Sequence, residues 1–210
     1  KDEAQAFARY VRQPTSETEQ AYTAACTAAE QSLAVLHRVM EEVVARCRET
    51  CQLGVLDQGN ILYLEKVDSP QAIRLISRVG DRLPANATAL GKALLSGLSD
   101  EEVRTLYAAG LPRLTSHTVT ELPQLLDQLA QIRSGCLAAE REECAQQLAC
   151  WAVPLRRKGR VFAALSVSAP LFRCTADKET LVCRCLRDAR RIWSSWPGRW
   201  DCHRRRWRSS

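Results

Sequence analysis

The sequence predicts an α+β domain in which an antiparallel sheet lies between helices. Two pairs of apolar segments, 51–56 with 61–67 and 148–155 with 161–168, are each separated by a short polar turn, which is typical of hairpins. Amphipathic stretches that begin at helix-capping residues alternate with these hairpins. No strict strand–helix–strand rhythm runs through the chain, which disfavours a parallel sheet.

Composition places the chain among ordinary globular proteins. Of its 210 residues, 46% are hydrophobic and 26% are charged, which suffices for one sizeable domain. No apolar run reaches the ~20 residues of a membrane span, and the N-terminus lacks signal-peptide features, so we expect a cytoplasmic protein without a membrane partner. Ten cysteines in a chain of this length favour reduced, buried thiols over disulfides or a zinc site, and we expect no cofactor and no metal.

The N-terminal part, residues 1–48, is expected to be helical. After Pro14, the segment 16–19 reads as a capping box, and apolar residues then recur at helical spacing as far as Arg48. That apolar face needs a partner, which the sheet of the same domain can supply.

The domain itself is expected to occupy residues 49–192. Alternating apolar and polar residues predict a strand over 72–78, after the first hairpin. Residues 193–210 contain five arginines after Gly198 and show no helical or strand periodicity, so we expect an unstructured tail. The alternative is contact with nucleic acid, for which interleaved aromatic and basic residues are typical. Capping residues and glycines predict four helices, Thr88 to Gly97, Ser99 to Gly110, Thr120 to Gly135 and Thr175 to Ile192.

The segment 78–95 contains the strongest candidate site. Its helix begins at Thr88, whose hydroxyl can cap the first turn. Small or apolar residues follow, so the amides of Ala89, Leu90 and Gly91 have no obvious side-chain partner, and such a helix start favours an anion. Gly91 also allows a ligand or a second backbone to approach closely. Most helix starts of this kind bind only water, so the local pattern alone does not establish a site.

Hydroxyl groups for the same site can come from the last predicted strand. Ser166 and Ser168 are two residues apart, so both side chains point to one face of the sheet. A sheet face with two satisfied serines is the simpler reading of this pattern. No two histidines suggest a shared metal or a nucleophile–base pair, so we expect a site that binds without catalysis.

Four segments of the chain match one known family in the same order, and they are 60–67, 83–95, 114–120 and 162–170. Together they resemble the effector-binding domain of IclR-type (isocitrate-lyase-regulator) bacterial transcription regulators, over residues 30–192. The resemblance implies a GAF-like fold, with helices on both faces of the sheet, and a small carboxylate as effector.

The resemblance also implies the residues of the effector site by position. The backbone amides of Ala89 and Leu90 would hold the carboxylate, and Glu140 stands where the family usually has Asp. The segment 144–147 departs from the family pattern at the rim of the pocket. The remaining pocket residues implied by the resemblance are Cys150, Ser166, Ser168, Leu75, Leu83 and Leu148, and the helix start adds Thr88 and Gly91 to the predicted site.

The function implied by the resemblance is transcriptional regulation, as a repressor or an activator, by a DNA-binding homodimer or tetramer. Residues 1–48 would then link the effector domain to a DNA-binding domain and contribute to the dimer. Residues 1–30 are too short for the N-terminal winged helix-turn-helix of the family, so we expect this DNA reader to be missing. A stand-alone small-molecule binding module, or a partner of full-length regulators that does not itself bind DNA, is the alternative.

Overall fold

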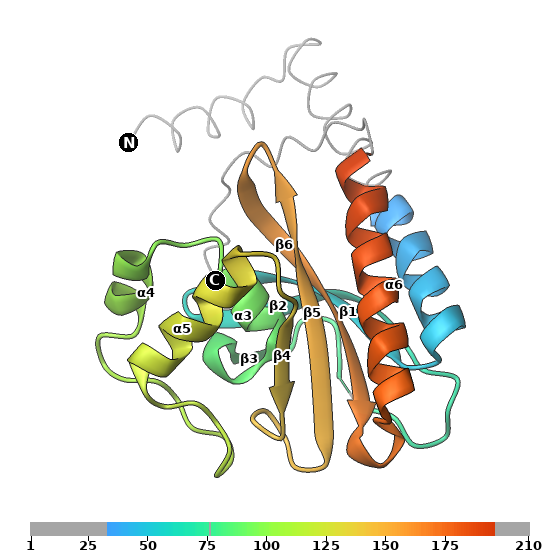
Figure 1. The fold of residues 1–210 in the computed structure, drawn as a ribbon, viewed down its shortest axis with the longest axis horizontal. Helices are drawn as coiled ribbons and strands as arrows, with labels where there is room; N and C mark the ends of the chain where they lie inside the picture. Colours follow the sequence, from blue (N-terminus) through green and yellow to red (C-terminus); the bar gives the residue numbers. More distant parts are fainter. Residues whose placement is uncertain (1–32, 76, 196–210) are drawn as a thin grey trace, which may run out of the picture. The chain divides into compact units, whose positions relative to one another are not determined.

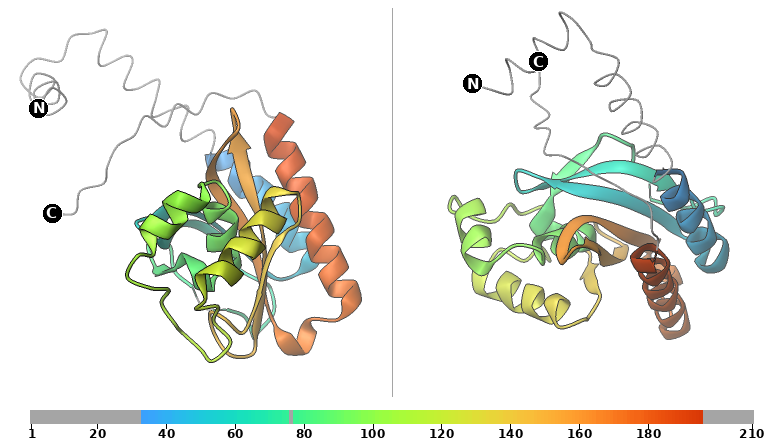
Figure 2. Two further views of the ribbon diagram at one scale, coloured as in Figure 1. Left: turned by 60° about the vertical axis from the view of Figure 1, so that its left-hand side comes forward. Right: turned by 90° about the horizontal axis from the view of Figure 1, so that it is seen from above.

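The computed structural model describes residues 33–75 and 77–195 of the protein. Within these residues, six antiparallel strands form one sheet in the order β3-β2-β1-β6-β5-β4 (Figure 1). The sheet is strongly curled, as Figure 2 shows. The predicted α+β class with an antiparallel sheet is therefore confirmed. The strands are β1 (Thr50–Asp57), β2 (Asn60–Val67), β3 (Arg82–Pro84), β4 (Ala138–Arg141), β5 (Leu148–Arg157) and β6 (Arg160–Pro170).

Helices cover both faces of the sheet (Figure 1). The first face carries α3 (Ala89–Leu95), α4 (Asp100–Leu106) and α5 (Leu122–Arg133). The second face carries α6 (Ala176–Ser195) and a helix over residues 33–47. The 3-10 turns η1 (Ala85–Ala87) and η2 (Leu171–Arg173) precede α3 and α6. None of the helices in the described residues is both long and apolar enough to cross a membrane.

Both predicted hairpins are confirmed, and each has a two-residue turn. Gln58 and Gly59 join β1 to β2, whereas Lys158 and Gly159 join β5 to β6. All four residues have positive φ, between 48° and 83°, which is the geometry that matches the twist of the flanking strands. These hairpins meet at the centre of the sheet, where β1 pairs with β6.

Strand β5 is buried on both faces, which explains its almost continuous apolar sequence. Its residues Leu148, Cys150 and Ala152 belong to the core beneath α3 and α5. The alternate residues along the strand face α6. Trp193 of α6 packs against Phe162 of β6, with ring centroids 5.4 Å apart.

Several element predictions need correction. The predicted strand over 72–78 is wrong. Residues 72–73 form a bend, 74–75 and 77–78 have no regular structure, and Ile73 is 63% exposed with no partner strand. Strand β4 was not predicted, since its four residues pair only with β5. The cap of α5 is not Thr120 but Glu121, which makes no side-chain capping bond.

The helix ends reflect local chemistry. The hydroxyl of Thr175 accepts a hydrogen bond from the amide of Lys178 at 3.2 Å, as expected for a capping residue. Helix α6 continues past residue 192 to Ser195. The predicted N-terminal helix is confirmed over residues 33–47, and Arg48, with φ of 58°, ends it. The rest of that helix, the linker and most of the predicted tail lie outside the described residues.

Candidate functional site

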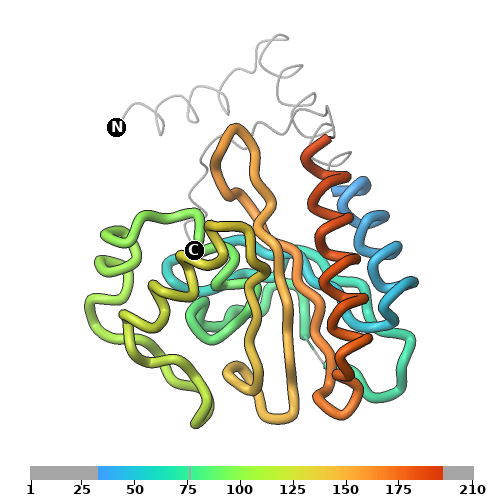
Figure 3. Tube along the Cα trace, viewed as in Figure 1, coloured from blue at the N-terminus to red at the C-terminus, as the bar shows by residue number. Residues whose placement is uncertain are grey.

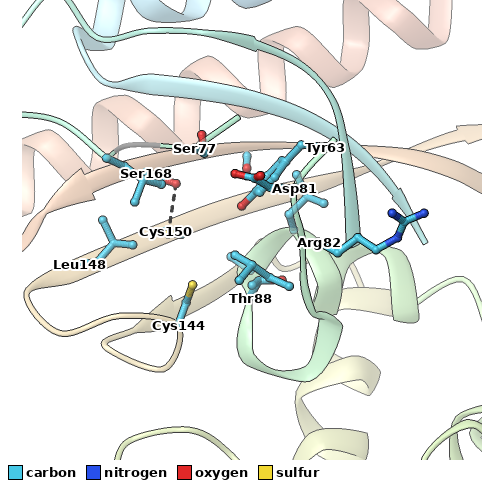
Figure 4. Close-up of a pocket in the computed structure, with 14 residues that line it drawn as sticks. Tyr63, Ser77, Asp81, Arg82, Thr88, Cys144, Leu148, Cys150 and Ser168 are labelled. Carbon is cyan, nitrogen blue, oxygen red and sulfur yellow. Dashed lines mark hydrogen bonds between the residues drawn. The ribbon is translucent and has the colours of Figure 1, made fainter. Parts of the chain in front are cut away.

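A cavity of about 220 Å³ lies between the start of α3 and the sheet (Figure 4). Its walls come from segments far apart in the sequence, which the trace brings together around β5 and β6 (Figure 3). Of the predicted site residues, Gly91 and Glu140 do not line this cavity. The predicted residues that do line it are Leu75, Leu83, Thr88, Ala89, Leu90, Leu148, Cys150, Ser166 and Ser168.

The start of α3 supplies backbone donors to the cavity. Thr88 has an extended backbone, and its hydroxyl accepts the amide of Gly91 at 2.9 Å. The amide of Gly91 is therefore not available to a ligand, which corrects the sequence prediction. The amides of Ala89 and Leu90 have no acceptor among the residues that the structure describes.

Gly91 has a packing role behind this turn. A Cβ atom on Gly91 would lie 2.2 Å from the carbonyl oxygen of Ala85 in η1, well inside van der Waals contact. The close approach that glycine permits is therefore to a second backbone and not to the cavity. This contact fixes α3 against η1 and so sets the position of the free amides.

Opposite the start of α3, the cavity is lined by the hydroxyls of Ser77, Ser166 and Ser168, and Tyr63 of β2 adds a phenolic hydroxyl. Gln52 of β1, which the sequence analysis did not single out, lies directly opposite Ser166 across the β1–β6 pair. Its Oε1 atom accepts the hydroxyls of Ser166 and Ser168 at 3.2 and 2.9 Å, and its Nε2 atom donates to Ser77 at 3.2 Å. The sequence signal that could have identified it is a glutamine within the predicted apolar strand, and the structure shows it fully buried.

Glu140 lies in β4 beside the cavity, opposite Cys150 of β5. One carboxylate oxygen, Oε2, accepts the amides of Glu143 and Cys144 at 2.9 and 3.3 Å, which fixes the loop after β4. The other, Oε1, is buried with no partner among the described residues. Burial raises the pKa of this carboxyl, despite the hydrogen bonds that lower it. Contact between Glu140 and an effector stays a prediction.

The two cysteines of the cavity are neutral thiols at ordinary pH. Burial raises the pKa of Cys150 well above its usual value, and the nearby carboxyl of Glu140 raises it further. Burial likewise raises the pKa of Cys144 to about 12. Sγ of Cys150 lies 3.2 Å from the hydroxyl of Ser168 (Figure 4). Neither thiol is a competent nucleophile in this state.

A buried ion pair supports α3 from behind. Nζ of Lys92 lies 2.5 Å from Oε1 of Glu143, and the other oxygen of Glu143 accepts the amide of Val119 at 3.2 Å. The backbone carbonyl of Glu143 accepts the hydroxyl of Thr118 at 2.7 Å. Neither Lys92 nor Glu143 was predicted to have a role, because the two charges are separated by 51 positions in the sequence.

The arrangement is suited to binding. The described lining of the cavity contains backbone amides, hydroxyls, thiols, apolar side chains and the rim charges Asp81 and Arg82, but no histidine. Such groups can hold and orient a small polar molecule. A general base poised for turnover is not among them.

Comparison with known proteins agrees with this description. Residues 26–194 match the family described as "Bacterial transcriptional regulator IclR C-terminal". The HTH-type transcriptional regulator KdgR of Dickeya chrysanthemi is 39% identical over 142 residues, which cover 67% of this chain and 47% of the relative. The chain spans about half the length of the curated relatives that it matches.

Solved structures are similar in fold and sequence. The C-terminal domain of Escherichia coli KdgR has a TM-score of 0.69 at 32% identity, covering 78% of this chain and 96% of that chain. An IclR homologue of Microbacterium hydrocarbonoxydans, crystallised with 4-hydroxybenzoate, has a TM-score of 0.71 at 31% identity, covering 79% of this chain and 68% of that chain.

These likenesses confirm the GAF-like α+β fold that the resemblance implied. The family and its relatives are transcriptional regulators and not enzymes, in agreement with a site that binds without converting its ligand. The chain belongs to the IclR family of bacterial transcriptional regulators and contains the C-terminal, effector-binding domain of that family.

Proposed function

We propose that the chain is the sensing part of a DNA-binding transcription regulator and that a small carboxylate occupies the cavity beside α3. One observation carries this proposal. Two unbonded backbone amides, three serine hydroxyls and apolar side chains meet around one partly open cavity. Such donors hold a carboxylate while supplying no acid or base to transform it.

The start of α3 supports a negative charge on the effector. The amides of Ala89 and Leu90 are unpaired within the described residues, and the first turn of α3 contains no acidic side chain. Partial positive charge at a helix start stabilises an anion, most strongly where water is excluded. Arg82 on the rim is already paired with Asp57 at 3.0 Å, so the backbone is the principal anion donor.

The other walls limit the size of the effector. A volume of about 220 Å³ is smaller than the ~300–1,000 Å³ of pockets that hold drug-sized ligands. Leu75, Leu83 and Leu148 add apolar surface on the sides. A compact acid with a few carbons or one aromatic ring fits these limits. The Microbacterium homologue, crystallised with the aromatic acid 4-hydroxybenzoate, supports the same class.

The signal would leave the cavity through a buried ionic link. The segment between β2 and β3 contributes Leu75 and Ser77 to the cavity, and the carbonyl of Ile73 in that segment accepts Nη1 of Arg173 at 2.9 Å. Arg173 also donates two hydrogen bonds, at 2.9 and 2.7 Å, to Glu49, which lies two residues after the end of the helix over residues 33–47.

This route connects the ligand to the helix that would set the arrangement of two subunits. Any such shift must come from a difference in affinity of the effector for the two arrangements. The protein would act in the cytoplasm as a homodimer or tetramer and would reach DNA through a helix-turn-helix part of the family. The relative from Dickeya supports this, since it is described as HTH-type.

A thermal-shift panel tests the effector proposal. Small aliphatic and aromatic acids are added to residues 1–210, and at least one is expected to raise Tm by mass action. Thr88→Asp should abolish the rise, because its carboxylate would compete for the same amides, whereas Thr88→Ser keeps the capping hydroxyl and should retain it. A panel that leaves Tm unchanged would refute the proposal.

A gel-shift series at several salt concentrations tests the DNA proposal. Sequence-specific retardation, reversed or strengthened by the effector, would support regulation by this chain. Retardation of every DNA that disappears steeply with salt would assign the binding to positive charge alone. No retardation, together with co-purification of a full-length family member, would instead favour a partner without its own DNA contact.

A further inference from the structure

Gln52 controls the polar side of the cavity although it does not itself line the cavity. It is fully buried in β1, and its amide lies among the hydroxyls of Ser77, Ser166 and Ser168. Ser77 and Ser168 lie across the cavity from Thr88 (Figure 4). A ligand whose carboxylate meets the start of α3 therefore presents its other end to these serines.

Hydrogen-bond accounting shows what each serine can offer. A serine hydroxyl has one hydrogen and two lone pairs. Ser166 and Ser168 both donate their single hydrogen to Oε1 of Gln52, so they can only accept a hydrogen from a ligand. Ser77 instead accepts from Nε2 of Gln52, and its own hydrogen has no acceptor among the described residues.

Cys150 reinforces this polarity. Its Sγ atom lies within hydrogen-bond distance of Ser168, at 3.2 Å, and its buried thiol remains protonated. The oxygen of Ser168 thus receives a hydrogen from Cys150 and gives its own to Gln52, which leaves one lone pair for a ligand. The serines thus present acceptors at Ser166 and Ser168 and a donor at Ser77, and the hydroxyl of Tyr63, which has no acceptor among the described residues, is a second donor.

We infer that Gln52 is a specificity-determining residue that selects effectors carrying a hydroxyl group at the end remote from the carboxylate. A hydroxyl donates to Ser166 or Ser168 and accepts from Ser77. An oxo group has lone pairs only, so it can accept from Ser77 or Tyr63 but leaves its oxygen against the lone pairs of Ser166 and Ser168. The selected class is small hydroxy acids, and this inference rests on the proposed binding of a carboxylate.

Matched pairs of acids test the inference by calorimetric titration of residues 1–210. Suitable pairs are glycolate with glyoxylate, lactate with pyruvate, 3-hydroxybutanoate with acetoacetate, and 4-hydroxybenzoate with 4-fluorobenzoate. In each pair that binds, the hydroxyl-bearing acid is expected to bind about tenfold tighter or more, because its analogue leaves buried polar groups unpaired.

Two variants assign the preference to Gln52. Gln52→Leu frees the hydrogens of Ser166 and Ser168, so the ratio between the two affinities should fall towards one. Ser77→Ala removes one of the two side-chain donors open to an oxo group there, so the ratio should rise. Gln128→Leu in α5 is the matched control, since it makes the same change away from the cavity and should leave the ratio unaltered.

The outcomes separate this inference from the proposed function. If none of the acids binds, the carboxylate proposal fails, and the inference fails with it. If acids bind but the oxo or fluoro members bind equally well or better, the polarity set by Gln52 is refuted while carboxylate sensing stands. Should Gln52→Leu not fold, the wild-type ratios and the response of Ser77→Ala still decide the question.

Discussion

Nζ of Lys92 and Oε1 of Glu143 lie 2.5 Å apart in the interior, with side chains that are 1% and 8% exposed. The pair joins α3, whose first turn faces the cavity, to the loop that follows β4. Its position makes the stability of the domain and the geometry of the cavity depend on the same two charges.

Removing one of these charges should be strongly destabilising. Lys92→Met leaves the carboxylate of Glu143 buried without its cation, and we expect a loss of ~3–5 kcal/mol in the free energy of unfolding, measured by urea denaturation. The double variant Lys92→Met/Glu143→Leu should recover much of this loss. Arg82→Ala, which breaks an exposed pair with Asp57, should cost less than ~1 kcal/mol. Equal effects of Lys92→Met and Arg82→Ala would contradict the prediction.

Gly91→Ala should destabilise the domain through a steric conflict. The added methyl would lie 2.2 Å from the carbonyl oxygen of Ala85, and backbone on both sides leaves little room to relax. We expect a loss of ~1–3 kcal/mol or more and a weaker thermal response to any bound acid. At Gly135 nothing lies within 4 Å and only the φ of 114° opposes alanine, so Gly135→Ala serves as a comparison that leaves the ligand response unchanged.

Glu140 should impose a pH dependence on stability. Burial raises the pKa of its carboxyl above the ordinary 4.5, so over a pH window above 4.5 the folded protein keeps a proton that the unfolded chain has lost. The stability contributed by this group is therefore present below pH 4.5 and declines as pH rises through the folded pKa.

Glu140→Gln removes this titration. The difference in unfolding free energy between the variant and the wild type should shift in favour of the variant as pH rises from 4 to 7.5, as urea denaturation at several pH values will show. A difference that stays constant across this range would mean that burial of Glu140 does not perturb its titration.

The cavity cysteines should react slowly with alkylating reagents. Burial raises the pKa of Cys144 to about 12 and that of Cys150 well above its usual value, so few thiolates exist at pH 7.5. Cys136, which is exposed, is the internal reference and should be modified first when iodoacetamide labelling is followed by peptide mass spectrometry. Labelling of Cys150 as fast as Cys136 in the folded protein would refute this environment.

The elements with strong local signals were predictable from sequence. The turns at Gly59 and Gly159, the capping box at Ser99 and the cap at Thr88 depend on residues within four positions of each other, so periodicity and turn chemistry located them. Nine of the predicted effector residues line one cavity because strand alternation and the family resemblance placed them on a common face.

Elements that depend on distant partners were not predictable. Strand β4 forms because its backbone pairs with β5. The described residues of 72–78 alternate in polarity as a strand does, but they pair with no strand. Gln52 depends on partners 25, 114 and 116 positions away, and Glu143 pairs with Lys92, 51 positions away. Such pairings are set by the packed fold and leave no periodic trace in the sequence.

The first turn of α3 has two amide hydrogens that the described protein does not satisfy. A metabolite that binds there supplies the missing acceptors from outside, and it does so only for the folded chain. Occupied copies therefore unfold less often than empty ones, so they are cleaved more slowly by proteases. If the proposed carboxylate binds there, the cellular amount of the protein, and not only its conformation, would follow the supply of that ligand.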